Sequence, residues 1–195
     1  EAVIRPGQAK AGPVVFSIDY RRQTGTPADT TYTTTDGSRL ILVDESNLIR
    51  NVPQIAKIID PNTDSLATNS QRLLDALFDN DPRTYAELAV NDNEAECYLL
   101  FDFGAAKRVR LTAVELLARP KYRDRLAGAI VQGSNNREMW TTLTEAAGNT
   151  EDWQNPKMKP SADAYRYLRI LNRNDWFCNV SEVRFHGGLK RLKTM

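Results

Sequence analysis

Residues 77–85, Leu-Phe-Asp-Asn-Asp-Pro-Arg-Thr-Tyr, gather the side chains best suited to hold a metal ion. Asp79 and Asp81 stand two residues apart, and Thr84 adds a hydroxyl just after them. In a tight turn, these groups and the turn carbonyls can aim oxygens at one point. Ca²⁺ takes six to eight such oxygens at about 2.3–2.6 Å. Asp, Asn and Pro are equally the ordinary residues of a loop without a ligand, so the motif alone leaves both interpretations open.

Two other segments combine planar hydrogen-bond donors with aromatic rings. Residues 119–125 place Arg119 and Arg125 on either side of Tyr122, and residues 174–177 end in Trp176 and Phe177. An Arg guanidinium is a rigid fork of donors that fits vicinal hydroxyls or a carboxylate. The five residues predict a glycan site if the two loops meet. The other interpretation is that the arginines are solvated loop charges and that Trp176 caps the core.

Catalysis finds little support in the residues. The chain has one histidine, His186, with no serine or cysteine placed beside it by sequence. Asp79 and Asp81 lie in a polar turn that gives no reason for a raised pKa. The chain has no Cys/His metal spacing and no glycine-rich phosphate loop. We therefore expect a binding protein and not an enzyme.

Composition and net charge limit the classes of partner that the chain is expected to bind. The 195 residues carry a formal net charge of +1, which favours neither nucleic acid nor an anionic membrane. No apolar run approaches the roughly 20 residues of a membrane span, and no secretory apolar segment opens the chain. Because the sequence starts at Glu1, we expect a processed or excised piece of a longer protein. Cys97 and Cys178 could form one bridge or remain buried thiols.

Period-two alternation dominates the chain and predicts an all-β fold. Asp36-Gly37 between residues 30–35 and 40–43 predicts a hairpin, and residues 14–20 alternate as a strand. Residues 70–78 predict a helical turn that leads into the Asp79 loop. Trp140 is expected in the core. Further strands are expected at 97–103, 109–118, 126–133, 140–144, 165–171 and 180–185. Short strands at regular spacing favour a β-sandwich or barrel.

Several segments, read in order, resemble the discoidin or coagulation factor type C domain, whose fold is shared with family 32 carbohydrate-binding modules. The segments that carry the resemblance are 77–85, 98–104, 117–120, 129–136, 140–143, 165–170 and 180–187. Together they cover roughly residues 47–187, and the first 45 residues match no known pattern. The resemblance implies an antiparallel β-sandwich jelly roll of the galactose-binding type, with an N-terminal β extension.

The resemblance also implies a structural calcium site near the chain ends. Its ligands would be the side chains of Asp79, Thr84 and Glu182, with Ala76 and Asp81 giving mainly carbonyl oxygens. Asn80 stands where the family usually has Gly, and Asn tolerates the left-handed conformation that the turn needs. Arg119 resembles the family's sugar-contacting arginine, and Trp176 or Phe177 its stacking aromatic residue.

The sequence thus predicts a noncatalytic carbohydrate-binding module of a secreted or cell-surface protein, with neighbouring domains attached. Its partner would be an oligo- or polysaccharide, without nucleic acid or membrane insertion. Residues 1–45 would be a β extension packed on the sandwich, 46–187 the module and 188–195 a tail. The alternative function is a protein-interaction or adhesion module on the same fold. Sugar binding needs an exposed aromatic ring beside hydrogen-bonding groups, whereas protein binding needs a broader patch with an apolar centre.

Overall fold

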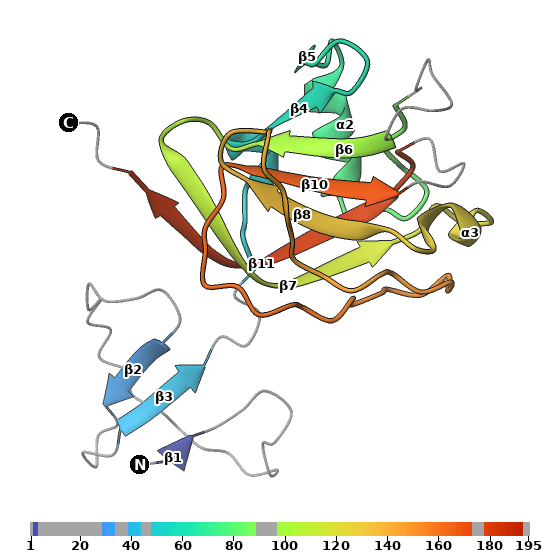
Figure 1. The fold of residues 1–195 in the computed structure, drawn as a ribbon. Helices are drawn as coiled ribbons and strands as arrows, with labels where there is room; N and C mark the ends of the chain where they lie inside the picture. The colour runs from blue at the N-terminus through green and yellow to red at the C-terminus, as the bar shows by residue number, and fades with distance from the viewer. Residues whose placement is uncertain are drawn as a thin grey trace. The chain divides into compact units, whose positions relative to one another are not determined.

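The structure is a computed structural model that describes residues 48–88, 97–172 and 178–192, together with the backbone of three short strands nearer the N-terminus. The chain divides into two compact units, residues 1–47 and 48–195. In the first unit, β1 (Ala2–Val3), β2 (Asp29–Thr33) and β3 (Arg39–Val43) form a sheet of order β1-β3-β2 (Figure 1). β2 and β3 are antiparallel, which confirms the predicted pairing. The strand expected at 14–20 lies outside the described residues.

The second unit contains two β-sheets that face each other, as Figure 1 shows. The larger sheet has the order β5-β4-β6-β10-β8-β9, and β11 and β7 form a second, antiparallel sheet. The elements of the second unit, in chain order, are α1 (Val52–Ile55), β4 (Lys57–Asp60), β5 (Ser65–Leu66), α2 (Ser70–Leu77), β6 (Cys97–Asp102), β7 (Lys107–Leu117), α3 (Arg123–Leu126), β8 (Ile130–Ser134), β9 (Thr141–Thr142), β10 (Tyr167–Asn172) and β11 (Glu182–Arg191). The predicted all-β antiparallel sandwich is confirmed.

The core lies between the two sheets. Leu99 and Phe101 of β6 and Val183 and Phe185 of β11 are at most 1% exposed, as the alternation predicts. The rings of Phe101 and Phe185 meet edge to face with their centres 5.2 Å apart. This contact joins the two sheets at the middle of the sandwich.

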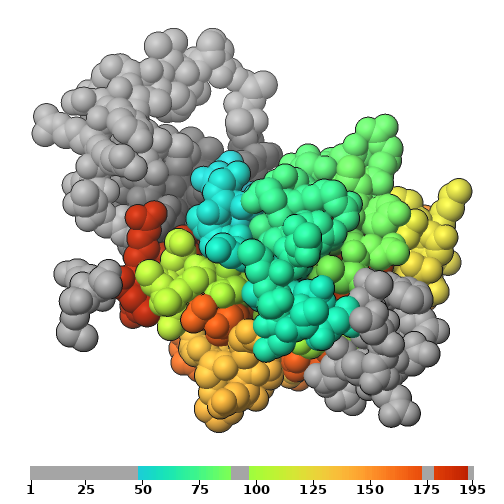
Figure 2. Space-filling model, turned by 90° about the horizontal axis from the view of Figure 1, so that it is seen from above, coloured from blue at the N-terminus to red at the C-terminus, as the bar shows by residue number. Residues whose placement is uncertain are grey.

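Helix α2 closes the core beside β4 and leads into the Asp79 loop. Leu73, Leu74 and Leu77 are buried on one face, and Gln71 and Asp75 are exposed on the other. This i, i+3, i+4 spacing is what fixes a short helix against a sheet. In Figure 2 the segment from β4 to residue 88, coloured cyan to green, covers the middle of the described surface.

Two predicted features differ in the structure. Residues 188–191, expected in a tail, belong to β11 because they pair with residues 107–110 of β7. Trp140, expected in the core, is partly exposed and packs on a small cluster separate from the main core. Cys97 and Cys178 are both buried and are not joined by a disulfide, and the Cys178 thiol donates to the Tyr98 carbonyl at 3.1 Å. Among the described residues, no helix is long and apolar enough to cross a membrane.

Packing of residues 1–45 on the sandwich stays a prediction. It rests on their β pattern and on their small number, which is too low for an independent core. We expect a chain of residues 48–195 to melt at a lower temperature than the full chain. Calorimetry of both would decide, because equal melting temperatures would mean that the first unit adds no stability to the second.

Candidate functional site

The loop after α2 gathers oxygens around the Thr84 hydroxyl. Thr84 Oγ1 lies 2.9 Å from Asp79 Oδ2, 2.9 Å from the Asp81 carbonyl and 3.2 Å from the Ala76 carbonyl. A hydroxyl has one hydrogen, so it can satisfy one of these three acceptors well. Three oxygen acceptors are therefore crowded around a single hydroxyl hydrogen.

Local sequence fixes the shape of this loop. Asp79 Oδ1 accepts from the Asp81 N–H at 2.8 Å, and the Thr84 N–H donates to the Asp81 carbonyl at 3.0 Å. Between them Asn80 takes a left-handed conformation with φ of 61°. Asn adopts that conformation more readily than most residues, so the turn forms without the expected Gly.

Glu182, at the start of β11, lies beside this loop although it is about 100 residues away in the chain. Its side chain is 2% exposed, and its Oε1 has no hydrogen-bond partner among the described residues. Burial, followed by a hydrogen bond to Asp79 and the charge of that carboxylate, raises the pKa of Glu182 to about 7. The Ser181 hydroxyl donates to the Pro82 carbonyl at 3.1 Å and holds strand and loop together.

Asp81 contributes its backbone carbonyl to the cluster, while its carboxylate points elsewhere. Both carboxylate oxygens accept from the Arg83 guanidinium, at 2.8 and 2.7 Å. These hydrogen bonds lower the pKa of Asp81 to about 2. Within the described residues, no three Asp, Glu, His or Cys side chains converge as a metal cluster. The donor set is therefore two carboxylates, one hydroxyl and two carbonyls, which is oxygen chemistry of the kind that suits Ca²⁺.

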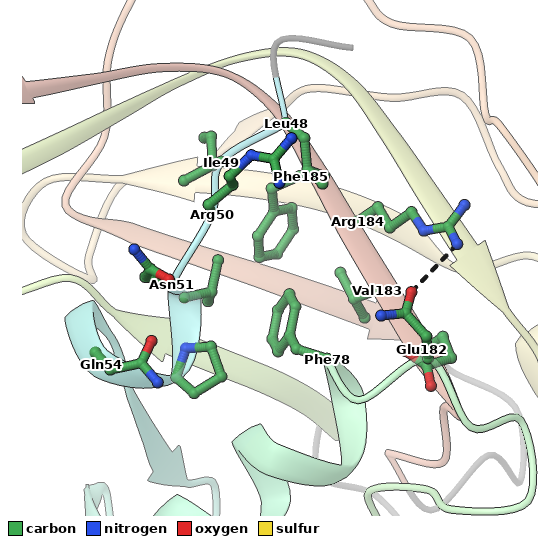
Figure 3. Close-up of a pocket in the computed structure, with 13 residues that line it drawn as sticks. Leu48, Ile49, Arg50, Asn51, Gln54, Phe78, Glu182, Val183, Arg184 and Phe185 are labelled. Atoms are coloured by element: carbon green, nitrogen blue, oxygen red, sulfur yellow. Dashed lines mark hydrogen bonds between the residues drawn. The ribbon is translucent and has the colours of Figure 1, made fainter.

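A pocket of about 320 Å³ borders this cluster and shares Glu182 with it, and Asn80 of the Asp79 loop also lines it (Figure 3). Phe78 and Phe185 form part of its apolar wall, and Arg184 donates to Asn80 Oδ1 at 3.3 Å, the dashed line in Figure 3. The left-handed Asn80 is thus tied to β11 by its own side chain.

A second set of predicted residues meets beside α3. The Arg119 guanidinium carbon lies 3.8 Å from the centre of the Tyr85 ring and 4.6 Å from that of Tyr122. The Arg125 guanidinium carbon lies 4.1 Å from the same Tyr122 ring. Tyr85, Arg119, Tyr122 and Arg125 therefore alternate as one stack, which we call the Tyr–Arg stack. Such stacking restrains each guanidinium while leaving its edge able to donate.

Glu87 adds an acceptor to the Tyr–Arg stack. Its Oε2 pairs with Arg119 Nη1 at 3.0 Å and accepts from Asn179 Nδ2 at 2.8 Å. The structure brings Arg119, Tyr122 and Arg125 together, while Trp176 and Phe177 lie outside the described residues, so the predicted meeting of the two loops stays a prediction. Sequence reasoning did not assign roles to Tyr85, Glu87 or Asn179. Tyr85 directly follows Thr84 and ends the 77–85 motif, and this position is the one sequence feature that could have indicated a role for it.

Comparisons with known proteins agree with the fold. The F5/8 type C domain model matches residues 62–183. CBM62 from Clostridium thermocellum Xyl5A is similar, with a TM-score of 0.52 and 22% identity over 69% of this chain and 94% of that chain. The C-terminal domain of a chitobiase from Bacteroides fragilis has a TM-score of 0.51 and 12% identity over 74% of this chain and 99% of that chain. A search of curated proteins finds no match. Because the family model spans more than half of the sequence, this chain belongs to the F5/8 type C domain family.

Proposed function

We propose that this protein is a noncatalytic carbohydrate-binding module of a secreted or cell-surface multidomain protein. The observation that carries the proposal is the Tyr–Arg stack with Glu87 at its side. Family membership and a fold similar to CBM62, a carbohydrate-binding module by name, support it. The glycan would be recognised at the stack, with Trp176 and Phe177 as further predicted contacts.

The chemistry of the stack suits a sugar ring. Tyr122 is 36% exposed, so the edge of its ring, which the stacked arginines leave open, can contact the apolar side of a pyranose. The guanidinium groups of Arg119 and Arg125 are held by stacking and can donate to adjacent hydroxyls. Glu87 can accept a hydrogen bond from a sugar hydroxyl, whereas the arginines can only donate. Because a solvated sugar gives up water hydrogen bonds, we expect a Kd of roughly mM to µM, raised in effect by attached domains.

A structural Ca²⁺ is the second part of the proposal. Asp79, Thr84 and Glu182 would hold it with side-chain oxygens, and Ala76 and Asp81 with carbonyls. The bound ion would supply positive charge where the structure sets two carboxylates close together. Tyr85 follows Thr84 directly, so the same loop that would hold the ion also positions one end of the Tyr–Arg stack. The ion would act on binding through loop order and not by touching the sugar.

A protein-interaction module on the same fold is the alternative. It calls for a broad exposed patch with an apolar centre. Among the described residues, the exposed large apolar side chains are Leu66, Tyr122, Met139 and Leu192, which come from four different segments. The concentrated, polar and aromatic Tyr–Arg stack favours a sugar over a protein surface.

Truncation of the stack tests the proposal. We expect Tyr122→Ala and Arg119→Ala to weaken glycan binding by about 1–3 kcal/mol each, roughly 5- to 150-fold in Kd. Arg119→Ala should also change the preference between neutral and acidic sugars, because it removes a planar donor. A glycan array would choose the ligand and isothermal titration would measure the Kd.

Arg123→Ala is the matched control. Arg123 is the first residue of α3 and directly follows Tyr122, but its guanidinium pairs with Glu151 at 3.6 Å. It should bind like the parent protein. If Tyr122→Ala and Arg123→Ala gave the same Kd as the parent for a glycan that the array selects, the Tyr–Arg stack would not be the glycan site.

A further inference from the structure

The outer face of the six-stranded sheet contains a hollow of about 450 Å³ that the Tyr–Arg stack does not share. Nine side chains line it: Asp64, Tyr98, Leu100, Asn136, Arg137, Glu138, Trp140, Tyr167 and Arg169. The core residues of the same strands, such as Leu99 and Ile170, point to the opposite face. Ile59, Leu100 and Tyr167 form a separate buried cluster here, with Tyr98 and Trp140 packed on it. The solvated face of an antiparallel sheet is usually polar, so an aromatic cluster on this outer face is unusual.

Arg169 is the most constrained charge in this hollow. It is 8% exposed, and its guanidinium carbon lies 4.1 Å from the centre of the Trp140 ring and 5.3 Å from that of Tyr98. Its Nε donates to Gln132 Oε1 at 2.7 Å. Burying a charge is costly unless its hydrogen bonds and surroundings compensate. Here the compensation also fixes a planar donor beside two aromatic rings.

The loop on one side of the hollow is held in place before any ligand arrives. The Ser134 hydroxyl accepts from the Arg137 N–H at 2.9 Å. Asn136 Oδ1 accepts from the Glu138 N–H at 3.0 Å, and Trp140 Nε1 donates to the Arg137 carbonyl at 3.0 Å. These bonds hold Arg137 in a left-handed conformation with φ of 68°. A loop fixed in this way loses little conformational entropy when it binds.

Asp64 provides the facing wall. Its carboxylate forms an ion pair with Arg137, and its backbone is also left-handed, with φ of 54°. Each such residue costs of order 1–3 kcal/mol of strain, which persists where the surroundings enforce it and is common at binding sites. Two strained residues from distant loops thus meet across one hollow.

We propose that this hollow is a second saccharide site, which takes one ring of a neutral sugar against Trp140. A pyranose offers hydroxyls that both donate and accept, and the hollow offers both kinds of partner: Arg137 and Arg169 as donors, Asp64 and Glu138 as acceptors. Two positive and two negative side chains balance, so the site favours a neutral ring over an anion. The volume is within the range of small-molecule pockets. None of the nine lining residues belongs to the Tyr–Arg stack, so the two sites stand or fall separately.

The three tryptophans allow a direct test. In the full chain labelled with 5-fluorotryptophan, each of Trp140, Trp153 and Trp176 gives one ¹⁹F resonance, which Trp→Phe variants assign. Methyl β-galactoside, methyl β-glucoside and N-acetylglucosamine are then titrated. We expect at least one of them to shift the Trp140 resonance saturably, and the Trp153 resonance to stay in place. Trp153 is the matched control because an arginine also stacks on its ring. The guanidinium carbon of Arg184, on β11 of the other sheet, lies 3.9 Å from the centre of the Trp153 ring.

Two variants separate this site from the Tyr–Arg stack. Asp64→Ala keeps the Trp140 reporter. It should raise the Kd of the sugar that shifts the Trp140 resonance by tenfold or more, whereas Tyr122→Ala should leave that Kd unchanged. The proposal is overturned if none of the three sugars moves the Trp140 resonance, if only an acidic sugar such as glucuronic acid does so, or if Tyr122→Ala abolishes the shift. If the protein binds a sugar without a change in the Trp140 resonance, and Tyr122→Ala abolishes that binding, the proposed function stands and only the second site is refuted.

Discussion

Chelation of divalent cations with EGTA is expected to lower the melting temperature of this protein, and to lower it more at about pH 8 than at about pH 5. The expectation follows from the pair of carboxylates at the proposed calcium site. Glu182 is 2% exposed and lies beside Asp79, and its pKa in the folded protein is about 7. A cation that binds the folded loop and not the open chain stabilises the fold by mass action.

The sign of the pH effect follows from proton binding. The ordinary pKa of a glutamate is 4.5, so between that value and about 7 the folded protein without metal binds a proton that the unfolded chain releases. The contribution of Glu182 to the stability of the metal-free protein is therefore fully present below the lower value and is lost as the pH rises through about 7. The fall amounts to roughly 3 kcal/mol for one group shifted this far. Calcium needs the ionised carboxylate, so its stabilising effect grows over the same range.

Substitutions at the site should separate these effects. Asp79→Ala should abolish the difference in melting temperature between calcium and EGTA. Glu182→Gln should remove the pH-dependent loss in EGTA, because the amide does not ionise, and should weaken the response to calcium. Asp75→Asn is the control, since Asp75 is exposed on α2 and accepts from Gln71 at 2.8 Å. Melting curves of the parent protein that coincide in excess calcium and excess EGTA at about pH 8 would refute the calcium site.

The local half of the proposed calcium site was predictable from sequence, and the long-range half was not. Asp79, Asp81 and Thr84 are close in the chain, so their spacing alone suggests a shared centre. Glu182 reaches them through the pairing of β11 with β7 and through the bond between Ser181 and Pro82. No periodicity reports such a contact, so the family resemblance was needed to expect it.

The outer hollow shows a different limit of sequence reasoning. Alternation in β6 and β10 predicts two faces but does not say which large side chains cover the outer one. Aromatic residues usually bury large areas, so Trp140 was expected in the core. It lies instead on the outer cluster with Arg169 stacked on it, because the turn that begins at Ser134 carries it to that side of the sheet. Deciding between the two places needs the strand register, which a single sequence does not fix.

Gly187→Ala is expected to be among the most damaging single substitutions in the second unit. The pairing of β7 with β11 shifts at this point, since His186 pairs with Ala113 and Gly187 pairs with Leu111, which leaves Thr112 as the extra residue of a bulge. The bulge changes which residues of β7 face inward. Along β7, Leu111 is buried before the bulge and Val114 after it, although they are an odd number of positions apart and would face opposite sides of a regular strand.

The chemistry of Gly187 explains why the bulge needs glycine. Its φ is 144°, a conformation that residues with a side chain rarely adopt, and a Cβ there would overlap the Arg110 carbonyl oxygen. Backbone strain of about 1–3 kcal/mol and overpacking of about 1–3 kcal/mol together give a loss of about 2–6 kcal/mol in the free energy of unfolding. Gly188→Ala is the matched control, because a Cβ at that position meets nothing within 4 Å and its φ is ordinary.

Urea unfolding of both variants in excess calcium checks the prediction. Gly188→Ala should keep the parent midpoint to within the effect of about 1 kcal/mol, while Gly187→Ala should move it far lower. The same register places Glu182 opposite Leu117 at the other end of β11, so Gly187→Ala should also weaken the response of the remaining folded protein to calcium. Equal midpoints for the two variants would mean that the strands can slide past the bulge, and that the position of Glu182 is set by the Asp79 loop and not by the sheet.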